Sequence, residues 1–87
     1  MASYSIRILK PASRELKRLD KSVAKRIVDR IDWLAENFPS VNHIALKGEL
    51  SGLFKLREGD YRIIYQIIHK DKMLLIHTIG HRREIYR

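Results

Sequence analysis

The chain has 87 residues, a length that predicts a single domain over residues 1–87. A hydrophobic share of 45% argues against disorder, and the absence of cysteine excludes disulfides and thiolate metal sites. Lys and Arg number 18 against 10 Asp and Glu, and the resulting formal charge of +8 favours a polyanionic partner, usually nucleic acid. The alternative is a basic surface that has no specific partner.

No stretch of the sequence is long and apolar enough for a membrane span, and the opening MASYSIRILK lacks the apolar centre of a signal peptide. A small domain without disulfides is more often intracellular than secreted. We therefore expect a cytoplasmic protein that has no membrane partner.

The first half of the chain predicts one strand and two helices. Residues 3–9, SYSIRIL, alternate as in a strand with one wetter face. Pro11 is tolerated in the first turn of a helix, so PASRELKRLD is predicted as a short helix that buries Ala12, Leu16 and Leu19. Asp20 or Ser22 would cap a longer helix, SVAKRIVDRIDWLAEN, which Pro39 ends. The apolar stripe of this helix consists of Val23, Ile27, Ile31, Leu34 and Phe38.

The second half predicts a small sheet. After a loop around residues 41–52, three segments are rich in β-branched and aromatic residues: LFKLR, YRIIYQII and KMLLIHTI. Gly59-Asp60 and Lys70-Asp71 separate them, so an antiparallel meander of three strands is expected. The predicted fold class is α+β in the order β-α-α-β-β-β, with an N-terminal helical hairpin packed on a small, mostly antiparallel sheet.

The turn at Gly59-Asp60 predicts which side chains share a face. A two-residue loop that begins with glycine suits a type II′ turn and would place Arg57 opposite Arg62. Side chains then alternate, so that Lys55, Arg57, Arg62 and Gln66 project together. The opposite set, which would face the helices, is Phe54, Leu56, Ile63, Tyr65 and Ile67. Two alternatives remain: a solvated face with the cations splayed apart, or a three-residue loop that moves Arg62 to the other face from Lys55.

The C-terminal segment GHRREIYR follows the last predicted strand. If Lys70-Asp71 is also a two-residue turn, Ile79 lies opposite Arg62, and the tail leaves the sheet beside the predicted cations. His81, Arg82 and Tyr86 would then close a basic pocket that begins on the sheet.

Such a pocket contains the residue types needed to cleave RNA without a metal. A base must take the proton of a 2′-hydroxyl, cations must stabilise the phosphorane, and an acid must protonate the leaving 5′-oxygen. Nearby cations favour a phenolate, which makes Tyr86 a candidate base, while His81 is the natural acid and Lys55 or an arginine competes with it. The sequence shows no acidic cluster or His pair with metal-ligand spacing, so we expect no metal site and no cofactor.

Several of these residues also have plain structural readings. Tyr86 could lie over the sheet edge, and Arg83 and Arg87 are more readily electrostatic than chemical. His77 stands in an apolar run and is expected to be a satisfied or half-exposed strand residue rather than a catalytic one. Trp33 is expected to be a core residue or a contact for a partner.

Two segments, LKGELSGLFKLREGDYRIIYQI and TIGHRREIYR, resemble the RelE branch of the RelE/ParE toxins of bacterial and archaeal toxin–antitoxin pairs. The resemblance extends over nearly the whole chain. It implies a ribosome-dependent endoribonuclease, or mRNA interferase, that cuts messenger RNA in the decoding site and so acts beside 16S-type rRNA.

The resemblance also implies roles for individual residues. Lys55, Arg62, Arg82 and Tyr86 fall where RelE-type toxins carry active-site groups, and His81 stands at a position that is lysine, arginine or histidine among relatives. Leu53 departs from the pattern, because some members carry a second lysine there. Residues assigned to RNA binding are Lys47, Arg57, Arg83 and Arg87.

The expected partner is a cognate antitoxin that wraps the toxin with an extended segment and a helix. The pair would form a heterotetramer that contacts operator DNA only through the antitoxin. A ParE-like poison of DNA gyrase, which has no catalytic activity, is the alternative function, and a non-toxic RNA-binding member is a third.

Overall fold

The computed structural model describes residues 3–81 and shows two helices and five strands within them. The sheet is ordered β1-β5-β4-β3-β2, and only the β1–β5 pair is parallel. The predicted α+β class and the mostly antiparallel sheet are therefore confirmed. In chain order the elements are β1 (Ser5–Ile8), α1 (Lys10–Arg18), α2 (Lys21–Glu36), β2 (Ile44–Ala45), β3 (Phe54–Glu58), β4 (Tyr61–Ile68) and β5 (Met73–His81).

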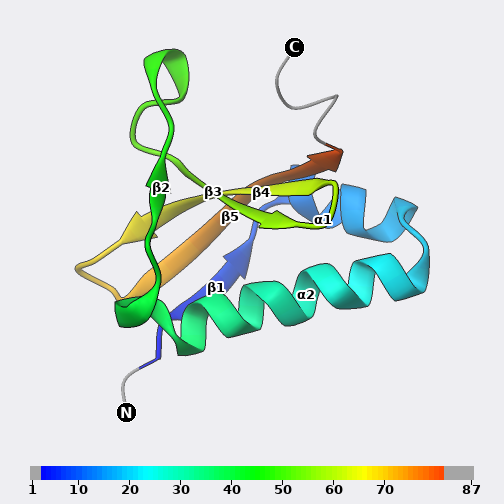
Figure 1. Cartoon of the computed structure of the whole chain (residues 1–87), viewed down its shortest axis with the longest axis horizontal. Coiled ribbons are helices and arrows are strands. Elements are labelled where there is room, and N and C mark those ends of the chain that lie inside the picture. The colour runs from blue at the N-terminus through cyan, green and yellow to red at the C-terminus, as the bar shows by residue number, and fades with distance from the viewer. Residues whose placement is uncertain (1–2, 82–87) are drawn as a thin grey trace.

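The two helices begin and end close to their predicted limits. Pro11 lies in the first turn of α1, and Asp20 precedes α2 as its N-cap residue. After α2 ends, Pro39 forms part of a short 3₁₀ turn, Phe38–Ser40. Figure 1 shows the helices running in roughly opposite directions. Within residues 3–81, neither helix is long and apolar enough to cross a membrane.

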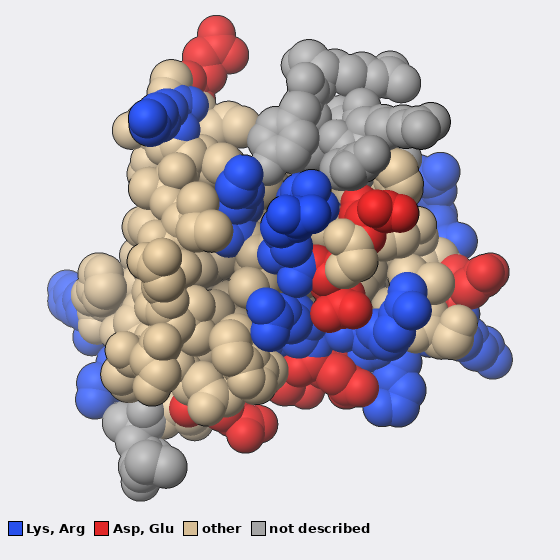
Figure 2. Space-filling view, viewed as in Figure 1, with Lys and Arg blue, Asp and Glu red and all other residues tan. Residues whose placement is uncertain are grey.

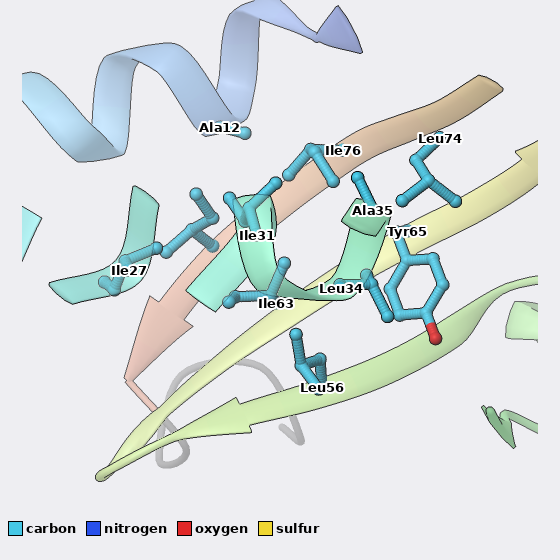
Figure 3. Packing of buried hydrophobic residues seen from close by; sticks show 11 residues of the cluster. Ala12, Ile27, Ile31, Leu34, Ala35, Leu56, Ile63, Tyr65, Leu74 and Ile76 are labelled. Carbon is cyan, nitrogen blue, oxygen red and sulfur yellow. The ribbon is translucent and has the colours of Figure 1, made fainter. Parts of the chain in front are cut away.

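Both helices cover the same side of the sheet, which we call the helix face. Ala12 of α1 and the α2 stripe residues Ile27, Ile31 and Leu34 are buried in one apolar cluster. Figure 3 shows this cluster packed over the strands. The predicted stripe is confirmed, since Val23 and Phe38 pack at its margin. The strands contribute Leu56, Ile63, Tyr65, Leu74, Ile76 and Ile79 to the same cluster.

β2 was not anticipated from the sequence, and it lies inside the predicted loop. Only two residues pair with β3, with Ile44 opposite Lys55 and Ala45 opposite Phe54. A strand of two residues is too short to show an alternating pattern. Figure 1 shows the segment after β2 extending away from α2, on the other side of the sheet.

A hydrogen-bonded chain ties the segment between α2 and β2 to the core. The Tyr65 hydroxyl lies 2.6 Å from His43 Nδ1, and His43 Nε2 lies 3.1 Å from the Phe38 carbonyl oxygen. Because a carbonyl oxygen can only accept, Nε2 carries the proton and Nδ1 accepts the hydrogen bond from Tyr65. Burial also raises the pKa of Tyr65 to about 12, since the phenolate would be poorly solvated there.

The hairpin between β3 and β4 has the predicted register. Arg57 lies opposite Arg62, and Lys55 lies opposite Ile64. Gly59 begins the turn with a φ of 60°, which fits the first position of a type II′ turn. The side chains of Lys55, Arg57 and Arg62 therefore belong to one face, opposite the helices, which we call the outer face.

The predicted register between β4 and β5 is wrong by one residue at its end. Gly80, rather than Ile79, lies opposite Arg62, and Ile79 pairs with Ile63. The cause is a β-bulge, because Ile64 pairs with Thr78 while Tyr65 pairs with Ile76, which leaves His77 as the extra residue. This extra residue lets both Ile76 and Ile79 reach the helix face, where they are buried.

Candidate functional site

The outer face of β3 and β4 brings three predicted site residues together. Arg57 and Arg62 are direct neighbours across the two strands, and Lys55 is two positions along β3 from Arg57. Like charges placed directly opposite each other on a sheet repel. Figure 2 shows Lys and Arg side chains across the middle of the molecule, with Asp and Glu side chains among them, beside a largely uncharged surface around β2. An anion bound between these cations would relieve their repulsion.

Arg62 is the most unusual of the three, because its side chain is buried. It is 7% exposed, and it is the only buried charged residue in the part of the chain that the structure describes. Its Nη1 donates to the Tyr61 carbonyl oxygen over 3.3 Å, while Nε has no hydrogen-bond partner among residues 3–81. A buried guanidinium that lacks a carboxylate is costly unless another group completes its hydrogen bonds.

Two acids of the described region form ion pairs away from the outer-face cations. The two ion pairs found in residues 3–81 join Glu15 to Arg18 over 3.1 Å and Asp29 to Lys25 over 3.0 Å. Both pairs lie within single helices, away from the sheet. Neither of these ion pairs involves Arg57 or Arg62, so neither offsets the positive charge of the two arginines.

The other two outer-face cations differ from Arg62 in their surroundings. Arg57 is exposed, and its carbonyl oxygen accepts a hydrogen bond from Arg30 Nε at 3.2 Å. Lys55 is half-buried. This mixture of one buried and two more accessible cations suits a phosphate, whose oxygens accept hydrogen bonds from guanidinium and ammonium groups.

His81 lies away from these cations. It is opposite Tyr61 in the β4–β5 ladder, and the two rings are 5.6 Å apart in an edge-to-face arrangement. Tyr61 packs against the core, so His81 lies at the margin of the helix face and not beside Arg62. The structure thus does not bring His81 together with Lys55 and Arg62 as the sequence analysis expected.

The remaining predicted residues are divided between an exposed loop and the end of the chain. Lys47 is exposed, just before the 3₁₀ turn Gly48–Leu50. Arg82, Arg83, Tyr86 and Arg87 lie outside the described residues, so their roles stay predictions. No group of three or more His, Asp or Glu side chains among residues 3–81 is arranged to hold a metal ion.

One feature of the outer face escaped the sequence analysis. Ile64 points to this face yet is 3% exposed, and it lines a cavity of about 440 Å³. His77, expected to be an ordinary strand residue, also lines the cavity, and its Nε2 lies 2.9 Å from Gln66 Oε1. The spacing of Ile76 and Ile79, both on the helix face, is the sequence signal that could have revealed the bulge behind this placement. Further lining residues are Leu50, Leu53, Thr78, Ile79 and Gly80.

The fold has a counterpart among known proteins. Residues 6–86 match the family described as the ParE toxin of type II toxin–antitoxin systems, parDE. The chain therefore belongs to this toxin family, and the predicted resemblance to the RelE/ParE toxins is confirmed.

Two relatives from Mycobacterium tuberculosis are similar over almost the whole chain. Toxin RelE is 32% identical over 97% of this chain and 87% of its own length. Toxin RelG is 30% identical over 97% of both chains. Among solved structures, the chain is similar to the toxin–antitoxin complex RelBE2 from the same organism, with a TM-score of 0.84, 28% identity and 97% of each chain covered.

Proposed function

We propose that this toxin is a ribosome-dependent endoribonuclease of the cytoplasm, which cuts messenger RNA in the decoding site beside 16S-type rRNA. The observation that carries the proposal is Arg62, a buried guanidinium whose Nε has no partner among residues 3–81. Arginine matches the paired oxygens of a phosphate and keeps its charge at any physiological pH. A scissile phosphate is therefore the ligand that best fits the outer face.

The proposed reaction uses the 2′-hydroxyl of the nucleotide before the cut. Tyr86 takes the proton from this hydroxyl, whose oxygen attacks the neighbouring phosphorus and displaces the 5′-oxygen of the next nucleotide. The products are a 2′,3′-cyclic phosphate and a 5′-hydroxyl. Arg62 and Arg82 stabilise the charge of the phosphorane, which is where fixed cations contribute most to the rate.

Protonation of the leaving 5′-oxygen falls to Lys55 in this proposal. Lys55 shares the outer face with Arg62, whereas His81 lies against Tyr61 on the other side of the sheet. His81 is the second candidate for the acid. Arg57, with Lys47, Arg83 and Arg87, would contact RNA backbone and not the reacting atoms.

Mapping of message ends after brief induction of the protein tests the activity. The wild-type chain is expected to produce sharp 5′ ends within translated codons, and Arg62→Ala is expected to abolish them. Arg26→Ala is the matched control, because Arg26 is an exposed arginine of α2 that should leave the cuts unchanged. Absence of new ends on induction of a toxic wild-type protein would refute the nuclease proposal.

A cognate antitoxin is the proposed protein partner, in a heterotetramer that reaches operator DNA only through the antitoxin. The similar RelBE2 structure is itself a toxin–antitoxin complex. Exposed apolar side chains offer contacts for this partner, since Ile44 of β2 and Trp33 of α2 are 48% and 41% exposed. Co-purification with the product of the neighbouring gene would test the partnership.

Inhibition of DNA gyrase without catalysis is the second candidate function. The matched family is described by its parDE members, and this description favours the alternative. A supercoiling assay with purified gyrase separates the two functions. The nuclease proposal predicts unchanged supercoiling at toxin concentrations that stop translation.

A further inference from the structure

We infer that the outer-face cavity binds a nucleobase next to the cleaved phosphate, and that His77 and Thr78 select a base that carries an amino group. The inference rests on the proposed nuclease function and adds a base-selecting pocket to it. Its starting observation is a cavity of about 440 Å³ that lies beside the cations.

The cavity and the cations are joined through the strand register. Ile64 lines the cavity and lies opposite Lys55 on one side and Thr78 on the other. Gly80, at the cavity margin, lies opposite Arg62. A nucleotide whose phosphate reaches Arg62 therefore has its base within reach of this cavity.

The lining suits the flat, partly apolar shape of a base. Ile64 is 3% exposed and provides a side chain on the sheet, while Leu50 and Leu53 come from the segment before β3. Ligand cavities in proteins typically measure about 300–1,000 Å³ and combine apolar walls with a few placed polar groups. Single-stranded RNA is commonly recognised through bases turned out into such sites.

The polar groups come from the bulge in β5. Because the bulge adds one residue, His77 and Thr78 both line the cavity, although they are consecutive in the strand. Bulges are frequent beside active sites, where they redirect a side chain. The hydrogen bond to Gln66, which projects from β4 on the same face, holds His77 in place.

The Gln66 contact also determines what His77 offers to a ligand. The amide oxygen of Gln66 can only accept, so His77 Nε2 donates to it over 2.9 Å. In the neutral imidazole, Nδ1 is then left as an acceptor. Adenine, cytosine and guanine each carry an exocyclic amino group that can donate to it, whereas uracil carries none and has carbonyl oxygens as its exocyclic groups.

Cleavage on programmed ribosomes tests the inference. Messages would place each of the four bases in turn at each position of the decoding-site codon, and initial rates would be measured for wild type, His77→Ala and Thr78→Val. At one codon position, wild type is expected to cut the message that carries the best amino-bearing base about five- to tenfold faster than the message that carries uracil. This ratio corresponds to the free energy of one neutral hydrogen bond. His77→Ala should reduce this ratio to about one.

His69→Ala is the matched control. His69 is an exposed histidine at the β4–β5 turn, where it contacts Tyr4 and not the cavity, so the variant should keep the wild-type ratio. A loss of fold alone would lower all rates together and leave the ratio between bases unchanged. Thr78 is exposed, and its replacement by valine removes only the hydroxyl, which makes it a second variant that should fold.

Three results would overturn the inference. Wild type could cut without any base preference, or both His77→Ala and Thr78→Val could keep the wild-type ratio. The variants could also weaken binding of the antitoxin while leaving base preference intact, which would assign the cavity to a side chain of that partner. If wild type cuts no programmed message at all, the nuclease proposal itself fails, and this outcome is distinct from the other three.

Discussion

The two faces of the sheet differ in whether their buried polar groups are hydrogen-bonded. On the helix face, the Tyr65 hydroxyl is fully buried and donates to His43, which in turn donates to the Phe38 carbonyl oxygen. On the outer face, Arg62 is buried too, yet its Nε has no partner among residues 3–81. Buried polar groups in native proteins are nearly always hydrogen-bonded, so an exception calls for an explanation.

The difference separates what holds the fold from what serves a ligand. The helix face is complete within the described residues, because its apolar side chains interlock and its polar atoms are paired. The outer face combines two neighbouring arginines, Arg57 and Arg62, with a cavity over Ile64. Changes on the helix face should therefore alter stability, whereas changes on the outer face should alter activity.

The largest effect on stability is expected from Ile63→Ala. Ile63 is fully buried on the helix face, so its truncation removes apolar contacts and leaves a cavity. The free energy of unfolding should fall by about 2–5 kcal/mol, as measured by urea denaturation. Val28→Ala, at a position of α2 that is 37% exposed, should cost far less. Equal losses for the two variants would contradict the assigned core.

Arg62→Ala should give the largest loss of activity. Removal of one fixed group that stabilises a transition state costs on the order of 10²–10³ in rate. The free energy of unfolding should not fall, because the change deletes a buried charge that has no carboxylate partner among residues 3–81. Cleavage on programmed ribosomes and urea denaturation check the two halves of this prediction. A variant that is strongly destabilised but still active would show that Arg62 stabilises the fold and does not serve catalysis.

Lys55 and His81 provide a test of the proposed proton donor. Lys55→Met should slow cleavage by about 10²-fold, which is typical of losing a general acid. His81→Asn should slow it much less, because His81 lies against Tyr61 away from the outer-face cations. Rates measured under single-turnover conditions give both values. A larger loss for His81→Asn would return the acid role to histidine.

Because Tyr65 is buried, we expect the stability of the fold to decrease at alkaline pH. An unfolded tyrosine ionises near pH 10, whereas burial raises the pKa of folded Tyr65 to about 12. Between these values the unfolded state loses its proton first, so the free energy of unfolding decreases as pH rises from about 10 to 12. The total loss from this group is about 2–3 kcal/mol.

Urea denaturation at pH 9 and pH 12 would measure this loss. Tyr65→Phe should show a correspondingly smaller decrease, while Tyr61→Phe should behave as wild type, because Tyr61 is only partly buried. A full alkaline decrease in Tyr65→Phe would show that another group is responsible.

The smallest effect is expected on the helix surface. Asp29 forms an exposed ion pair with Lys25 over 3.0 Å. Exposed pairs one helical turn apart contribute about 0.3–0.5 kcal/mol, so Asp29→Ala should change the free energy of unfolding by no more than this amount. Cleavage should be unchanged. An effect of Asp29→Ala on cleavage would show that the helix surface takes part in function.

Most of the fold could be predicted from local patterns. The α2 stripe with Ile27 and Ile31 has helical spacing, and Gly59 specifies the turn that places Arg57 opposite Arg62. In both cases one short stretch of sequence contains the physical cause. The same logic predicted that Lys55 and Arg62 share a face.

What could not be predicted depends on distant residues. The bulge at His77 arises because Ile76 and Ile79 both pack beneath the helices, and the helix face decides that placement. The cavity needs Leu50 and Leu53 to lie near Ile64, a contact that no local pattern shows. His81 was expected beside the cations because the extra residue of the bulge was not foreseen.

One substitution in the RNA tests the central claim most directly. A message programmed on ribosomes would carry a single 2′-deoxynucleotide immediately before the phosphate that wild-type protein cuts. Without the 2′-hydroxyl no attacking oxygen is present, so cleavage at that phosphate should disappear while the all-RNA message is still cut. Equal cleavage of both messages would contradict the mechanism assigned to the outer face.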